Sequence, residues 1–273
     1  MSKFVITGFS DEIADDLKTQ MDELDQLGVK HIEMRGVNGK PLVKHSPDEV
    51  RLIKNELDKR GFKVSAIGSP IGKTKITEDF EPCLELFKHI VEIAKILDTE
   101  YIRVFSFYIP EGESPEQHRE EVMKRFKTFV NVLEGSSLVL LHENECGIYG
   151  DTPERCMDLF KTINSKHLKA IIDIGNFVKC GVENNVEAYK FLKNEIVYVH
   201  VKDASPEEKH FLPIGEGKGM AKELFTALNN DEFEGFLSIE PHLKYLPVSG
   251  PEQFKIACNA LKKLLFEITG EIY

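Results

Sequence analysis

The sequence predicts a single α/β domain over residues 1–273, in which eight parallel strands close into a (β/α)8 or TIM barrel. Short apolar segments alternate with amphipathic helical stretches eight times, with no linker or low-complexity tract between them. The length of 273 residues also suits this barrel, which commonly needs ~250 residues. An open doubly wound sheet is less favoured, because Gly8-Phe9-Ser10-Asp11 replaces the dinucleotide-binding glycine fingerprint after the first strand.

The expected strands are short and apolar, and each leads into a helical pattern. They cover residues 3–8, 31–34, 63–67, 101–105, 137–142, 170–174, 196–201 and 235–239. Helices are expected at about residues 11–28, 46–61, 79–97, 114–133, from 152 onward, 186–192, 221–228 and 251–266. Ser46-Pro47-Asp48-Glu49 and Ser114-Pro115-Glu116-Gln117 have the pattern of capping boxes, which predicts two of the helix starts.

The charge and the cysteine content indicate which classes of binding partner and which cellular compartment to expect. Thirty-five basic against 46 acidic residues give a net charge of −11, which disfavours nucleic acid and anionic membranes as partners but permits a local basic pocket. The five cysteines are odd in number and none are spaced two residues apart, as expected for reduced thiols. Without a signal-peptide pattern or an apolar run of ~20 residues, we expect a cytoplasmic protein.

The last four strands each deliver a potential metal ligand at their carboxyl end. These residues are Glu143, Asp173, His200 and Glu240. Barrel enzymes build their active sites at this end of the strands. Alone, each residue is more simply a helix cap, a solvated charge or a core histidine, but three carboxylates gathered there would repel one another without a cation. Oxygen-rich ligation with one histidine suits Mn²⁺, Mg²⁺ or Co²⁺, with Zn²⁺ as an alternative.

With these strand ends, the chain resembles the xylose isomerase-like superfamily of sugar isomerases and epimerases, which also contains endonuclease IV. The resemblance covers almost the whole chain, including the segments Ile32-Glu33-Met34-Arg35, Tyr101-Ile102-Arg103-Val104-Phe105 and Pro213-Ile214-Gly215-Glu216-Gly217. It implies that the four strand-end residues hold one divalent metal ion. It also implies that Glu143 and Glu240 act as acid and base on opposite faces of the substrate, and that the protein forms a homo-oligomer.

Three positions depart from the ketose epimerases of this superfamily. Their histidine three residues after the aspartate is Asn176 here, their arginine six residues after the metal histidine is Pro206, and their acidic residue six after the first glutamate is Tyr149. Lys202 and Lys218 are nearby cations that can replace the arginine, and solvated surface lysines are an equally favoured interpretation. Ketose 3-epimerase activity is therefore too specific a prediction.

Six residues near the strand ends are candidates for substrate contacts. They are Glu33, Arg35, His142, Glu145, Asn176 and Lys202. Glu33 and Arg35 end the second strand, where a structural ion pair is the alternative. For Arg103 and His242 we expect a packing ion pair and a loop position, respectively.

These residues predict a metal-dependent isomerase or epimerase of a sugar, sugar phosphate or related polyol, which moves a proton next to a carbonyl through an enediolate. A dehydratase or lyase that acts on an inosose-like keto-polyol uses the same groups and is the alternative. An endonuclease IV-type nuclease is less favoured, because the first four strand ends supply few histidines and the net charge opposes DNA binding.

Overall fold

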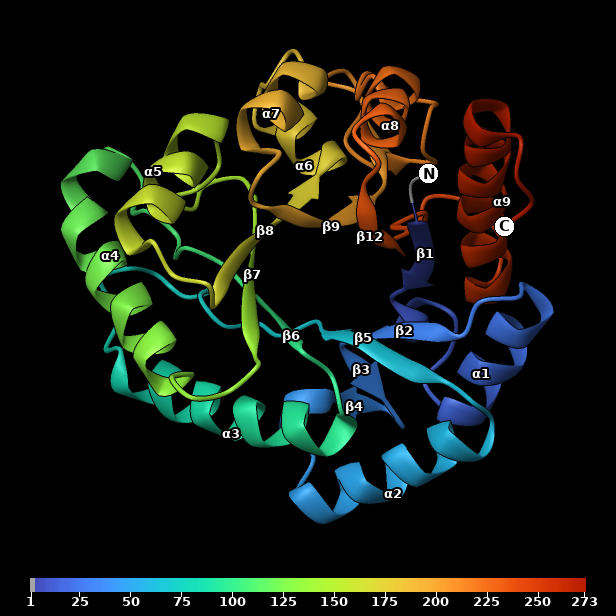
Figure 1. Cartoon of the computed structure of the whole chain (residues 1–273), viewed down its shortest axis with the longest axis horizontal. Coiled ribbons are helices and arrows are strands. Elements are labelled where there is room, and N and C mark those ends of the chain that lie inside the picture. Colours follow the sequence, from blue (N-terminus) through green and yellow to red (C-terminus); the bar gives the residue numbers. More distant parts are fainter. Residues whose placement is uncertain (1–2) are drawn as a thin grey trace.

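The strands of the barrel are parallel and surround a common axis, and most of the helices form a ring outside them (Figure 1). The computed structural model describes residues 3–273. The eight strands of the main sheet are β1 (Lys3–Gly8), β2 (His31–Met34), β5 (Lys63–Ile67), β6 (Tyr101–Val104), β7 (Val139–Glu143), β8 (Leu168–Asp173), β9 (Ile196–Val201) and β12 (Glu234–Ile239). Their order is β1-β12-β9-β8-β7-β6-β5-β2. Because β1 and β2 at the two ends of this order lie side by side, the barrel is nearly closed.

The outer helices follow the strands in the order that the sequence predicts. They are α1 (Leu17–Gln26), α2 (Pro47–Lys59), α3 (Glu81–Leu97), α4 (Pro115–Val132), α5 (Pro153–Ile163), α7 (Asn185–Leu192), α8 (Ala221–Asn230) and α9 (Gly250–Thr269). The loops after the strands carry further short elements: η1 (Ser10–Glu12), the β3–β4 hairpin (Gly36–Val37 and Lys40–Pro41), η2 (Leu42–Lys44), α6 (Ile174–Lys179) and the β10–β11 hairpin (Asp203–Ala204 and Phe211–Leu212). These elements build the mouth of the barrel.

Helix starts show where local sequence signals hold and where they fail. The capping box of α2 is confirmed, since Ser46 and Glu49 bond to each other's backbone amides. The second expected box is wrong, because the Ser114 side chain makes no capping hydrogen bond. The first helix begins at Leu17 rather than near residue 11, because the Asp16 side chain accepts a 2.8 Å hydrogen bond from the Thr19 amide and so caps the helix there.

The core has two parts, and the smaller one forms the floor below the mouth. A large apolar layer fills the space between helices and strands. Inside the barrel, Ala66, Leu141, Ile171 and Tyr198 form a separate buried cluster. The Tyr198 hydroxyl lies 2.9 Å from the Ser65 hydroxyl, which satisfies both groups. The interior is therefore packed, and open space remains at the mouth. Within residues 3–273, no helix combines the length and apolarity needed to cross a membrane.

Candidate metal centre

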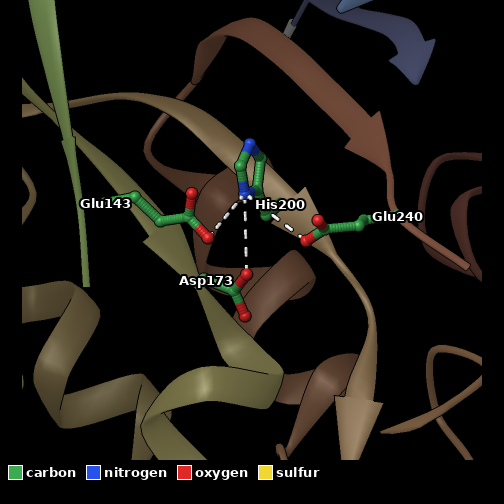
Figure 2. A group of neighbouring side chains, drawn as sticks. All are labelled: Glu143, Asp173, His200 and Glu240. Carbon is green, nitrogen blue, oxygen red and sulfur yellow. Dashed lines mark ion pairs between the residues drawn. The ribbon is translucent and has the colours of Figure 1, made fainter. Parts of the chain in front are cut away.

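Four side chains from neighbouring strands meet at the carboxyl-end mouth of the barrel. Glu143 ends β7, Asp173 ends β8, His200 lies in β9 and Glu240 follows β12 directly. Each offers one ligand atom, and these atoms lie within 4.8 Å of one another. The four residues are at most 3% exposed. The structure therefore brings together the residues that the sequence predicts as metal ligands (Figure 2).

The imidazole of His200 lies at the centre of this cluster. The distances from its Nδ1 atom are 3.2 Å to Glu143 Oε1, 3.5 Å to Asp173 Oδ2 and 3.9 Å to Glu240 Oε2. Figure 2 shows Glu143 and Glu240 on opposite sides of the imidazole, with Asp173 between them. A single ring nitrogen therefore faces three carboxylates.

Glu33 holds the other side of the imidazole from below. Its Oε2 atom lies 3.0 Å from His200 Nε2 and accepts a 2.6 Å hydrogen bond from Ser238 Oγ. A carboxylate only accepts hydrogen bonds, so Nε2 carries the ring proton in this contact. Glu33 and Glu143 outweigh burial and hold the pKa of His200 well above 6.5, so Nδ1 carries a proton as well at neutral pH. A divalent ion would displace this Nδ1 proton and bind the lone pair, while Glu33 still holds Nε2–H.

The donor atoms of the cluster fit a divalent cation. Among residues 3–273, Glu143 Oε2, Asp173 Oδ2 and His200 Nδ1 are buried atoms that lack a hydrogen-bond partner. Two of them have a cation nearby, since Arg103 Nη1 lies 3.1 Å from Glu143 Oε2 and Lys202 Nζ lies 2.6 Å from Asp173 Oδ2. Three carboxylates and one imidazole, once the imidazole gives up its Nδ1 proton, form a ligand set for one divalent ion, which these four residues would hold.

Lys202 contributes a positive charge within the cluster. It is buried, and its ammonium contacts Glu240 Oε2 as well as Asp173. Burial alone would lower the pKa of Lys202, but the two carboxylates outweigh burial and hold the pKa above its ordinary value of 10.5. The lysine therefore stays charged beside the expected ligands.

Neighbouring cations keep both glutamates ionised. Burial favours the neutral form of Glu240, but Lys202 and His242 reverse this effect and hold its pKa well below 4.5. The pKa of Glu143 is likewise below its ordinary value, because the central imidazole and Arg103 outweigh burial. Both side chains are thus carboxylates at neutral pH, and either can accept a proton.

A cavity of about 560 Å³ opens above the cluster. This volume lies in the range of small-molecule sites. Side chains from both halves of the chain line it, and they include Arg35, Pro41, Val43, Lys44, Pro70, Lys73, Leu86, Arg103, Glu143, Glu145, Asn176, Lys202, Phe211, Glu240 and His242. The metal centre therefore forms the floor of a chamber that can hold a small molecule.

Four of the six residues expected to contact a substrate line this cavity, namely Arg35, Glu145, Asn176 and Lys202. The Asn176 amide donates hydrogen bonds to Glu143 Oε1 at 3.2 Å and to the carbonyl of Asn144 at 2.9 Å. Arg35 lies 3.3 Å from Glu240 and also pairs with acidic residues of η1. Their contact with a substrate stays a prediction.

The other two candidates, Glu33 and His142, do not reach the cavity, and we correct the expectation for them. Glu33 is fully buried beneath His200. His142 points to the helix side of β7, where its Nε2 lies 2.9 Å from Ser106 Oγ. Burial there lowers the pKa of His142 to about 3, so the ring is neutral and packs against the rings of Phe126 and Phe160.

Several residues of the site carry no strong signal in the sequence. His242, expected in a loop, lies 2.9 Å from Glu240 Oε1, and Arg103 forms its ion pair at the metal centre. Phe211 comes from the β10–β11 hairpin, and its ring lies 4.8 Å from the Lys202 ammonium. For Arg103 a signal exists: it stands two residues after Tyr101, whose ring packs inside the barrel, so both side chains point inward.

The loop after β9 is fixed by one buried carboxylate. Asp203 accepts hydrogen bonds from the amides of Ala204, Gly215 and Gly219, at 2.8, 3.0 and 2.8 Å. A Cβ atom at Gly217 would lie 2.4 Å from Asp203, so a side chain has no room there. This arrangement fixes the chain beyond Lys202 and holds the segment that contains Phe211 at the rim of the mouth.

The fold and the cluster define an α/β barrel with a buried acid–histidine site at the carboxyl ends of its strands. The model of the family described as xylose isomerase-like TIM barrel matches residues 21–264. The chain therefore belongs to this family, as the resemblance of its strand ends implies.

The chain is also similar to several individual proteins. An uncharacterized protein of Methanocaldococcus jannaschii is 31% identical over 167 residues, and the match spans 58% of this chain and 56% of that protein. Among solved structures, a D-tagatose 3-epimerase-like protein is 22% identical with a TM-score of 0.77, and the match covers 98% of each chain. The IOLI protein with a bound zinc atom is 17% identical with a TM-score of 0.78, and covers 99% of this chain and 100% of its own. At these identities, the structures show a shared fold.

Proposed function

We propose that the chain is an isomerase or epimerase that moves a proton at a carbon next to a carbonyl group of a small carbohydrate or polyol, with one divalent metal ion. The observation that carries the proposal is the position of two ionised glutamates, Glu143 and Glu240, on opposite sides of one ligand cluster at the floor of the cavity. The ligand cluster, together with a structural neighbour that binds a zinc atom, supports the metal requirement.

The two glutamates would divide the proton transfer between the two faces of the substrate. One carboxylate removes the proton beside the carbonyl, the C–H electron pair forms the carbon–carbon double bond of an enediolate, and the carbonyl oxygen gains negative charge. The bound ion supplies Lewis-acid stabilisation of that charge. The opposite glutamate, which takes up a proton from water, would deliver it to the other face and invert the carbon centre, while the first glutamate releases its proton to water. If the first glutamate instead gives its proton to the former carbonyl carbon, and the hydroxyl proton of the enediolate passes to the former carbonyl oxygen, the product is an isomer.

Contacts from other strands fix the orientation of each glutamate. Arg103 and Asn176 lie 3.1 and 3.2 Å from the two oxygens of Glu143. Lys202 and His242 contact the two oxygens of Glu240. Reacting groups held in a fixed position lose little freedom on the way to the transition state, which is a main source of rate enhancement.

The test is proton exchange with D₂O over a panel of ketoses, ketose phosphates and inosose-like ketones, with the Mn²⁺-loaded protein. Wild type should incorporate deuterium beside the carbonyl and form an epimer or isomer. Glu143→Gln and Glu240→Gln should each lower kcat at least ~100-fold. If the reaction is an epimerisation, each variant should still exchange the proton on the face of its remaining glutamate.

The control is Glu195→Gln, the same substitution at the amino end of β9, where Glu195 pairs with Lys169 far from the mouth. This variant should match the wild type. Full activity of Glu240→Gln would refute its role in proton transfer. Loss of water from the substrate would instead identify a dehydratase, and several zinc ions per chain would favour a nuclease.

A further inference from the structure

The charged side chains that line the cavity are distributed unevenly along the chain. The lining residues between positions 35 and 103 include four cations, Arg35, Lys44, Lys73 and Arg103, which we term the cationic wall. No carboxylate lines the cavity in this range; the lining carboxylates Glu143, Glu145 and Glu240 come from later in the chain, as does the lining cation Lys202. In a chain with a net charge of −11, such a local reversal of sign requires a specific reason.

Two members of the cationic wall are already neutralised at the floor. Arg35 pairs with Asp11, Glu12 and Glu240, and Arg103 pairs with Glu143. These guanidinium groups serve the metal centre and its surroundings. The two lysines differ, because they stand toward the opening and are accessible from the cavity.

Lys73 contacts the ring of Phe105, which also contacts Arg103 at the floor of the cavity. Its ammonium lies 4.3 Å from the centre of the Phe105 ring, and the Arg103 guanidinium lies 5.0 Å from the same ring. Lys73 also pairs with Glu145 at 2.9 Å, but its side chain is 35% exposed, so the ammonium can accept a further partner. Phe105 thus contacts both a cation of the ligand cluster and a cation that is partly exposed to solvent.

Lys44 supplies the second accessible charge. It ends η2, is exposed and lines the cavity, and no ion pair connects it to any other residue between positions 3 and 273. Val43, Pro70 and Leu86 line the same cavity and provide apolar surface there. A ligand here therefore meets a carbon-lined wall that carries ammonium groups with unused hydrogen-bond donors.

We propose that the substrate carries an anionic group, a phosphate ester or a carboxylate, which binds Lys44 and Lys73 while its carbonyl end faces Glu143 and Glu240. This inference rests on the proposed function and specifies its substrate class. A neutral sugar would leave the charge of Lys44 unused, whereas an anion gains charge-assisted hydrogen bonds from both ammonium groups. When the anion binds, the Lys73 ammonium would contact the anion and keep only part of its contact with Glu145.

The test measures binding, so that it does not depend on turnover. The Mn²⁺-loaded full chain is titrated by calorimetry with fructose, fructose 6-phosphate and 2-keto-gluconate, which represent a neutral polyol, a phosphate and a carboxylate. At least one anion should bind about tenfold more tightly than fructose. Lys44→Met and Lys73→Met should each lower the affinity for that anion about tenfold and leave the affinity for fructose unchanged. The anion whose affinity these substitutions lower shows whether the substrate carries a phosphate or a carboxylate.

Lys75→Met is the matched control, because Lys75 lies in the same loop, is exposed and does not line the cavity. It should bind all three ligands like the wild type. Equal affinity for fructose and both anions overturns the inference, as does failure of both anions to bind at millimolar concentration. Anion preference without D₂O exchange would leave this inference standing and refute the proposed function, whereas exchange without anion preference would do the reverse.

Discussion

Replacement of Glu33 by glutamine removes one negative charge beneath the metal centre while it keeps the volume of the side chain. In the native structure the carboxylate contacts His200 Nε2 at 3.0 Å and Ser238 Oγ at 2.6 Å, and it is fully buried. Hydrogen bonds to a charged group stabilise by ~1.5–3 kcal/mol and neutral ones by ~1 kcal/mol, so each contact weakens by about 1 kcal/mol.

The contact with His200 matters most for the metal ion, because it fixes the tautomer that directs Nδ1 toward the carboxylates. Loss of this partner should lower the affinity for Mn²⁺ about 10–100-fold, the usual range for partners of metal-binding histidines. This range corresponds to roughly 1.4–2.7 kcal/mol. It agrees with the loss expected from a weakened charged hydrogen bond together with a less basic imidazole.

The assay is a calorimetric titration of the metal-free protein with Mn²⁺, in competition with a chelator of known affinity. Circular dichroism of the same samples verifies that the variant is folded. Glu195→Gln, far from the mouth, should retain the affinity of the wild type. If Glu33→Gln binds Mn²⁺ as tightly as the wild type, Glu33 does not orient the imidazole and the assigned tautomer is wrong.

Two further predictions concern stability. Lys202→Met removes the nearest cation of Asp173 and Glu240. The free energy of unfolding should therefore fall by about 3 kcal/mol when a chelator is present, and by less when Mn²⁺ is bound. Equal losses in both conditions would contradict this. Hydrogen bonds from Arg119 hold the pKa of Asp158 in the folded protein below its ordinary value of 3.8. The charged pair therefore stabilises the fold fully above about pH 3.8, and this contribution disappears as the pH falls through the lower pKa of Asp158 in the folded state. Asp158→Asn should therefore cost up to about 1 kcal/mol near pH 6 and nothing near pH 2 in urea titrations, and a constant difference would disprove the assignment.

The four-membered cluster was accessible from the sequence because strand ends of a parallel barrel all meet at one mouth. The same alternation of side chains also explains the misplacement of His142. Its neighbour Glu143 faces the axis, so His142 must face the helices, and the period of two alone suffices to predict this.

The depth of Glu33 was not accessible in this way. The level of a residue along the barrel axis depends on the stagger between strands, and the pairing of β2 with β5 contains a register shift between Ile32 and Glu33. Such a shift leaves no trace in the pattern of apolar residues. Lys44 and Lys73 belong to loop elements whose course depends on tertiary packing, and the sequence therefore gave no reason to place them beside the cluster.

The cationic wall and the metal ligands occupy separate stretches of the chain. All four expected ligands lie between residues 143 and 240, whereas the wall lies between residues 35 and 103. Substitutions at Lys44 and Lys73, which contact neither glutamate, can therefore alter which molecule is retained while the ion and the two glutamates keep their positions. This separation allows new specificities to evolve on a constant chemical centre. Directed evolution confined to the loops after β2 and β5 is the corresponding route to a changed substrate.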